Sequence, residues 1–436
     1  MGKISPFQII ILVVSGIAIV VGVLLFAFSR SNQSQNNVEV SIWGIMPSDD
    51  FTALVNDILD RDRKSINVVY TAFDPENFET ELVENLAEGK GPDIILLPQD
   101  LLLKHQNKLY TLAYEFYPQR DFKDTFIEES ELFIHAGGII GIPFTVDPLV
   151  MYWNRTMFTE ANLSQPPSEW GEILEIASKL TNRDSSFSII DSGVALGEFR
   201  NINQAKEIFI TLLLQAGNPV VRRDVNVPEV YDVYHSILDE RLGYTIAPIE
   251  AALNFFTQFS NPSKAVYSWN RSLPSSKDMF LSGDLAIYFG FASEYEDLKR
   301  KNPNLNFDVA LMPHSSNGSS ATYGKMTAFS ITKNTQNTGP AYDALLKLTS
   351  PEAISFISNY TKLPPVRRDL LVVPPQDAAL SVFYNSALRA KGIYDPDPVK
   401  SQTILQDMVE SFVTGRSVSS DVVNTADILL EQALNE

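Results

Sequence analysis

Hydrophobic and polar positions follow two alternating periods over residues 38–97. Short apolar runs, typical of strands, cover residues 38–43, 67–73 and 93–97. Between them, a helix begins at Ser48, and a second helix carries Phe78 and Leu82 and ends at Gly89. This order of strands and helices predicts a doubly wound α/β unit. Ligands of such sheets bind at the carboxyl ends of the strands, which here are residues 43–47, 73–77 and 98–100.

The same alternation returns downstream with a larger share of helix. The spacing predicts helices over residues 204–216, 248–259 and 277–281. It predicts strands over residues 284–290, 307–312 and 327–333. These elements are too numerous for one small sheet, so the sequence predicts two α/β lobes.

The amino-terminal segment has a different character. Residues 9–28 carry no charge, and twenty residues in a helix extend about 30 Å, the thickness of the bilayer core. The match to a signal-peptidase site at Ala27-Phe28-Ser29 is weak, which favours an uncleaved transmembrane anchor. We expect residues 1–8 in the cytoplasm, a polar tether over residues 29–38, and the body outside.

Composition narrows the classes of function. The 436 residues include 34 Lys and Arg against 53 Asp and Glu, a formal net charge of −19. A strongly acidic chain is unsuited to nucleic acid, because phosphates are neutralised by Lys and Arg. The chain has no cysteine, which excludes disulfides, thiolate metal sites and a cysteine nucleophile. The length corresponds to about two or three domains.

Catalytic motifs are mostly missing. The sequence contains none of the zinc-protease, serine-hydrolase, P-loop or dinucleotide fingerprints. The four histidines are far apart, and Asp395 and Asp397 are interpreted as part of a proline-stiffened turn, not a calcium loop. We therefore expect no metal and no cofactor. A pair of catalytic carboxylates without a sequence signature remains open.

Six segments occur in a recognisable order. They are GKGPDI (89–94), GGIIGIP (137–143), LVMYWNRTMF (149–158), PPSEW (166–170), MFLSGDLAI (279–287) and LPPVR (363–367). Together they resemble the extracellular solute-binding proteins of family 1, the maltose-binding-protein-like receptors of sugar ABC transporters. The resemblance implies an α/β, two-lobed periplasmic-binding-protein-like (type II) fold with hinge strands. It places residues 39–146 and about 312–352 in lobe 1, and about 147–311 and 353–436 in lobe 2.

The resemblance also implies ligand contacts. The family's acidic residues after the GKGPDI strand and after the GIP segment fall on Asp100 and Asp147. A family aromatic falls on Ser293, where the nearest rings are Phe291 and Tyr295. Carboxylates accept hydrogen bonds from sugar hydroxyls, and an aromatic ring packs on the C–H face of a pyranose. Trp43 and Trp269 are candidate platforms, and the loop residues Arg200, Asn201, Gly324 and Lys325 are further candidates.

These observations predict a binding protein without catalytic activity. We expect a monomer, anchored in the cell membrane by its amino-terminal helix, that binds a carbohydrate between its lobes. The resemblance implies that it delivers the carbohydrate to ABC transporter permease subunits. Two alternatives stay open: a stand-alone sugar sensor with the same fold, and an anchored extracytoplasmic hydrolase.

Overall fold

The strands predicted for residues 38–97 form one end of a ten-stranded sheet in the computed structural model, which describes residues 38–58, 66–226, 231–315 and 319–436. β1 (Val38–Gly44) lies between β2 (Ile66–Ala72) and β3 (Ile94–Pro98) and runs parallel to both. α2 (Ser48–Ile58) and α3 (Pro75–Ala87) connect these strands. The doubly wound unit predicted from the sequence is therefore confirmed.

Local chemistry explains where α3 begins and ends. The Asp74 side chain caps the helix by accepting a hydrogen bond from the backbone N–H of Glu76 (3.1 Å), and proline occupies the first turn. Phe78 and Leu82 bury the inner face of the helix. Gly89 has a φ of 71°, a left-handed conformation that lets the chain leave the helix and enter β3.

The first lobe is completed by short elements and by segments that return late in the chain. Its β4, β5 and β6 form a small antiparallel sheet of their own. The remaining elements are α4 (Leu102–His105), β4 (Leu112–Ala113), α5 (Gln119–Thr125), β5 (Ile134–His135), β6 (Gly138–Ile139), α12 (Thr338–Leu348), α13 (Pro351–Thr361), α14 (Arg368–Leu371) and β15 (Ala390–Lys391).

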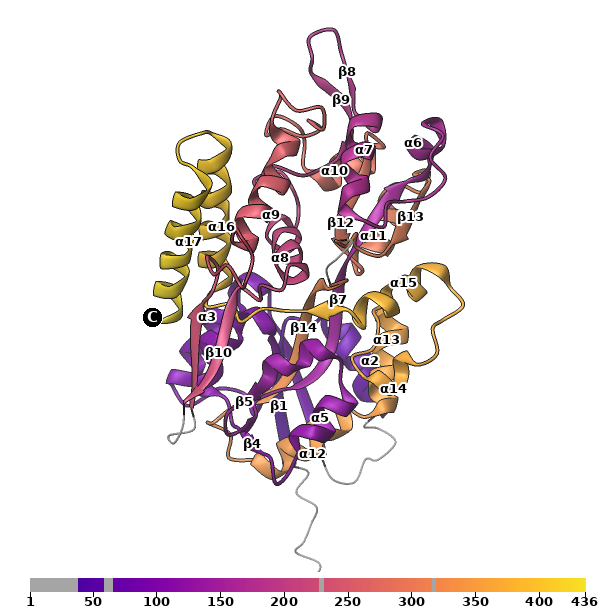
Figure 1. The fold of residues 1–436 in the computed structure, drawn as a ribbon. Coiled ribbons are helices and arrows are strands. Elements are labelled where there is room, and N and C mark those ends of the chain that lie inside the picture. The colour runs from indigo at the N-terminus through magenta and orange to yellow at the C-terminus, as the bar shows by residue number, and fades with distance from the viewer. Residues whose placement is uncertain (1–37, 59–65, 227–230, 316–318) are drawn as a thin grey trace, which may run out of the picture.

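The second lobe surrounds the other end of the sheet (Figure 1). Its α8, α9, α10 and β12 agree with the elements predicted from the sequence. The elements are α6 (Arg155–Glu160), α7 (Trp170–Leu180), β8 (Asn182–Arg183), β9 (Ile189–Val194), α8 (Ala205–Gln215), β10 (Val221–Asn226), β11 (Tyr231–Ser236), α9 (Pro248–Thr257), α10 (Ser276–Ser282), β12 (Leu285–Phe291), α11 (Glu294–Lys301), β13 (Phe307–Ala310), α15 (Ala378–Ala387), α16 (Pro398–Val413) and α17 (Ser419–Leu434).

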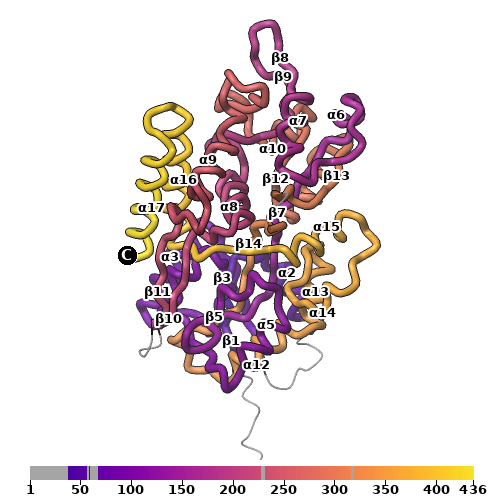
Figure 2. Tube along the Cα trace, viewed as in Figure 1, coloured from indigo at the N-terminus to yellow at the C-terminus, as the bar shows by residue number. Residues whose placement is uncertain are grey.

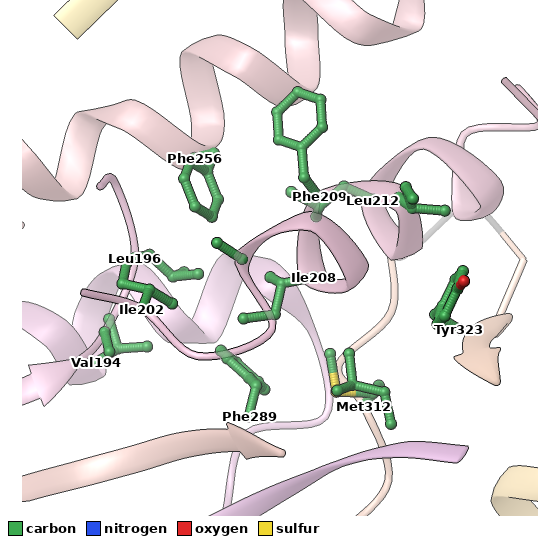
Figure 3. Packing of buried hydrophobic residues seen from close by; sticks show 14 of the residues in the cluster. Val194, Leu196, Ile202, Ile208, Phe209, Leu212, Phe256, Phe289, Met312 and Tyr323 are labelled. Carbon is green, nitrogen blue, oxygen red and sulfur yellow. The ribbon is translucent and has the colours of Figure 1, made fainter. Parts of the chain in front are cut away.

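Each lobe has its own hydrophobic core. In the second lobe, Ile208 and Phe209 of α8 are fully buried and lie between α9 and β12 (Figure 3). Phe209 meets Phe256 of α9 edge-on, with ring centroids 5.7 Å apart. The first lobe has a separate cluster built on β1, β3 and the helices around them. Two cores on one continuous sheet indicate two lobes that are joined by shared strands.

The boundary between the lobes differs from the expectation in one respect. Residues from about 353 onward were expected in the second lobe. Instead α13 and α14 contribute Ile354, Ile357 and Leu371 to the core of the first lobe. The chain returns to the second lobe at α15, where Phe383 joins the core of that lobe. The sequence pattern marks these helices as amphipathic but carries no signal for which lobe covers them.

A hairpin of the second lobe, β10 with β11, reaches back to the first lobe, and we call it the strap. Arg223 donates to the carbonyl oxygen of Ile134 and to Asp232 Oδ1 (2.7 Å). Asp232 Oδ2 accepts from the backbone N–H of Ala136 (3.0 Å) and lies 3.0 Å from His135 Nε2. The strap therefore bridges the lobes on one flank.

The predicted membrane anchor over residues 9–28 and most of the tether lie outside the described residues. Among the residues that are described, no helix has the length and apolar character needed to cross a bilayer.

Candidate functional site

Three of the segments that cross between the lobes meet at the candidate site. β7 (Ile142–Asn154) pairs with β14 (Thr322–Ile331) in its first half and with β12 and β13 in its second half. The third crossing follows β15 and runs across the middle of the molecule to α16 (Figures 1 and 2). Shared strands of this kind are typical hinges, because small backbone changes in them move whole lobes.

Asp147 lies on β7 at the crossing. Its Oδ1 accepts a hydrogen bond from the backbone N–H of Ser293 at the start of α11 (3.0 Å). Burial raises the pKa of Asp147 to about 6, although the hydrogen bonds from Ser293 and the charge of Lys325 oppose the shift. Lys325 is opposite Asp147 in the β7–β14 register, and its Nζ lies 4.2 Å from the ring centroid of Phe291. Asp147, Phe291 and Lys325 therefore lie together.

Asp100 approaches the same place from the first lobe. It belongs to the short 3₁₀ turn Gln99–Leu101 that follows β3. Burial raises the pKa of Asp100, and so does the charge of Asp395, whereas Lys206 and Lys325 lower it. Asp100 is thus within electrostatic reach of groups on the second lobe, on β14 and on the third crossing. This is the position that the carboxyl ends of parallel strands predict for a ligand contact.

A buried ion pair joins the second lobe to the third crossing. Lys206 Nζ lies 2.6 Å from Asp395 Oδ2 and donates a second hydrogen bond of 2.6 Å to Ser401 Oγ. Sequence reasoning missed both charged residues: Asp395 was interpreted only as part of a turn. That turn does exist, since Asp397 caps α16. The partner of Asp395 is 189 positions away, and no local pattern indicates it.

The other candidates lie in different surroundings. Trp43 is partly buried on β1, and its ring is tilted on that of Phe73 with centroids 4.8 Å apart. Trp269 is fully buried in the core of the second lobe, where its indole Nε1 donates to Asn201 Oδ1 (3.0 Å). A ring with no exposed face offers no platform to a ligand in this conformation. Trp269 is therefore a core residue here, in contrast to the expectation.

Tyr295, on α11, packs its ring among other aromatic side chains. Its ring packs between Phe307 and Phe383, with both centroid distances 5.8 Å, and Lys299 Nζ lies 4.9 Å from its centroid. Phe291, the other ring predicted near Ser293, lies beside Lys325, which is opposite Asp147 in the strand register. Arg200 forms an ion pair with Glu410 at 2.6 Å.

Comparison with known proteins identifies the family. A sequence model described as bacterial extracellular solute-binding protein matches residues 51–379, well over half of the chain. The chain is a bacterial extracellular solute-binding protein. The resemblance inferred from six short segments is thus confirmed. Members of this family are receptors that bind solutes and perform no chemistry, which removes the hydrolase alternative.

Relatives of this solute-binding protein are distant in sequence. A protein of Brucella abortus strain 2308, described as a binding protein, is 22 % identical over 278 residues. A protein of Brucella suis biovar 1 (strain 1330) has the same identity. The match covers 61 % of this chain and about 60 % of the length of each relative.

Solved structures share the fold. The sugar-binding protein MalE from Xanthomonas citri has a TM-score of 0.72 at 17 % identity, covering 91 % of this chain and 98 % of that one. The cyclic α-maltosyl-1,6-maltose binding protein from Arthrobacter globiformis has a TM-score of 0.72 at 15 % identity, covering 92 % and 99 %. A cyclo/maltodextrin-binding protein complexed with maltotetraose has a TM-score of 0.71 at 15 % identity, covering 90 % and 96 %. The expected periplasmic-binding-protein-like fold is therefore confirmed.

Proposed function

We propose that this solute-binding protein captures a carbohydrate between its lobes and delivers it to the permease of an ABC transporter. The observation that carries the proposal is that Asp147 lies beside Lys325 and Phe291 where the hinge strands cross, with Asp100 within electrostatic reach of the same Lys325. The carbohydrates named for the structures of similar fold support the same class of ligand.

The chemistry of these side chains suits a polyhydroxyl ligand. Within the described residues, neither Asp100 nor Asp147 belongs to an ion pair shorter than 4 Å, so each can accept hydrogen bonds from a ligand. Lys325 is about half exposed and adds donors on the same side. Trp43, at the carboxyl end of β1, is the aromatic surface we assign to a sugar ring. A sugar that lacks one of the contacted hydroxyls would leave a buried polar group of the site unpaired. The site should therefore discriminate between sugars.

The proposal includes an anchor. Residues 9–28 would cross the membrane once, and residues 29–38 would tether a monomeric body on the extracytoplasmic side. Such a tether keeps the receptor close to its permease and raises its effective concentration there. The proposal would place the protein in the cell membrane.

A melting screen tests the proposed ligand class. We would purify the full chain in detergent and measure its melting temperature with mono- and oligosaccharides, using amino acids and metal ions as controls. A matching sugar should raise the melting temperature, because a ligand that binds only the folded state stabilises it. A shift produced only by a non-carbohydrate would show that the ligand class is wrong.

The Asp147→Asn variant tests the site. A hydrogen bond to a charged group contributes about 1.5–3 kcal/mol, so the affinity for the sugar should fall by about 10- to 100-fold. Asp124→Asn is the matched control, because the Asp124 side chain is 70 % exposed on α5. Isothermal titration calorimetry would measure both. An Asp147→Asn variant with unchanged affinity would remove Asp147 from the site.

A further inference from the structure

Glu129 is a buried carboxyl group at the junction of the lobes. It lies in the 3₁₀ turn Glu128–Phe133 and is 2 % exposed. Within the part of the chain that the structure describes, neither Oε1 nor Oε2 has a hydrogen-bond partner. The Gln99 amide beside it donates its hydrogen bond of 2.6 Å to the carbonyl oxygen of Gly324, and it also interacts weakly with the Glu129 carboxyl group.

The hinge segments are shaped around this carboxyl group. A Cβ atom on Gly324 of β14 would lie only 2.2 Å from Glu129 Oε2. A Cβ atom on Gly392 of the third crossing would lie 2.8 Å from Gln99 Nε2. Glycine is therefore needed on β14, where the backbone approaches Glu129, and on the third crossing, where the backbone approaches Gln99. Glu129 is in contact with the segments about which the lobes would move.

A crevice of about 200 Å³ reaches Glu129 from outside, and both lobes form its walls. The first lobe contributes Glu129 and Leu132, and the second lobe contributes Pro219 and Val221. The third crossing closes the crevice with residues 391–394. A relative movement of the lobes would therefore widen or narrow the access of water to Glu129.

The charged groups around Glu129 do not neutralise it. Lys391 pairs with Glu128 at 2.9 Å, and Lys123 pairs with Glu131 at 2.6 Å. Asp147 on β7 adds repulsion. The other titratable groups on the elements packed against the turn, or on the strands beside it, are Asp100, Arg120, Asp121, Asp124, His135, Tyr152, Tyr323, Lys325 and Tyr394. None of them forms an ion pair or a hydrogen bond with Glu129 among the described residues.

An ionised carboxylate without a partner is strongly disfavoured in a protein interior, so a buried carboxyl group takes up a proton instead. The geometry therefore requires Glu129 to be neutral in this arrangement of the lobes. In agreement, burial raises the pKa of Glu129 from 4.5 to about 8, although the Gln99 side chain opposes the shift, and the charge of Asp147 adds to it.

We propose that Glu129 is a proton-binding site that couples the arrangement of the two lobes to pH. The arrangement described here holds a proton on Glu129, and an arrangement that admits water to the crevice releases it. Acid therefore favours the described arrangement and alkali favours the widened one. Between the pKa of 4.5 for a hydrated glutamate and the value of about 8 here, the ratio of the two arrangements changes about tenfold per pH unit. This inference does not depend on which solute binds.

Distances between spin labels test the coupling. Because the chain has no cysteine, Lys90→Cys in the first lobe and Ile190→Cys in the second would place one label on each lobe. Both side chains are well exposed. We would record distance distributions for the full chain in detergent from pH 5 to pH 9. In the labelled parent, the populations should change with pH, and in the Glu129→Gln background they should stay constant.

Glu131→Gln is the matched control. Glu131 lies on the same turn but is 40 % exposed and paired with Lys123, so this variant should keep the pH response of the parent. A pH-independent parent, or a response that persists in Glu129→Gln, would overturn the proposal. If Glu129→Gln does not fold, carbon-13 titration of the side-chain carboxyls in the unsubstituted chain decides instead. One carboxyl with a midpoint near pH 8 supports the proposal, and its absence overturns it.

Discussion

Replacing Asp395 should strongly destabilise the fold, because it forms one half of a buried ion pair. The Asp395 side chain is fully buried and that of Lys206 is 6 % exposed, with Nζ and Oδ2 2.6 Å apart. Among the described residues, Asp395→Ala would leave the Lys206 ammonium with Ser401 Oγ and the carbonyl oxygen of Pro398 as its partners. Breaking one side of a buried pair costs about 3–5 kcal/mol. The free energy of unfolding should fall by that amount.

A double-mutant cycle separates this effect from simple loss of packing. Lys206→Met/Asp395→Leu removes both charges with similar volume, so it should destabilise less than either of its component substitutions, Lys206→Met or Asp395→Leu, alone. Urea unfolding followed by circular dichroism and by tryptophan fluorescence measures each free energy, and coincident transitions justify the two-state treatment. A loss below about 1 kcal/mol for Asp395→Ala, or a double variant equal to the sum of the singles, would refute the reasoning.

Two further substitutions test the packing of the hinge and of the second core. Gly324→Ala should cost about 1–3 kcal/mol, because the new methyl group would meet Glu129. Gly339→Ala should be nearly neutral, because beyond its chain neighbours and its own helix backbone no atom of the described residues lies within 4 Å of the new Cβ. Urea midpoints compare the two variants. Trp269→Ala should cost about 3–5 kcal/mol by leaving a cavity, and Trp43→Ala should cost less because Trp43 is partly exposed. Equal losses within either pair would contradict these assignments.

Local patterns predicted much of the fold. Hydrophobic period and capping residues suffice for α2, α3, β1, β2 and β3, because burial on one or both faces shapes those sequences directly. β10 was not predicted, since it carries Arg222, Arg223 and Asp224 in succession and shows no alternation. Its strand conformation comes from pairing with β11 and from contacts to the first lobe, which are tertiary effects.

The candidate site was predictable where a residue belongs to a recognisable segment. Asp147 follows the GIP segment, and Asp100 follows the strand after GKGPDI. For Trp269 the residue type alone could not distinguish a cleft from a core, since tryptophan is common in both. Lys206 and Asp395 meet only because α8 and the third crossing approach each other in the folded chain. Such long-range pairs leave no trace in a single sequence.

The strap joins the lobes on one flank of the molecule, which makes the two flanks mechanically unequal. Any swing that parted the lobes on its flank would have to break the bonds from Arg223 to Ile134 and from Asp232 to Ala136. The crevice between Leu132 and Val221 lies directly beside these bonds. Widening that crevice would therefore require the strap to loosen, so the strap sets the cost of separating the lobes on this flank.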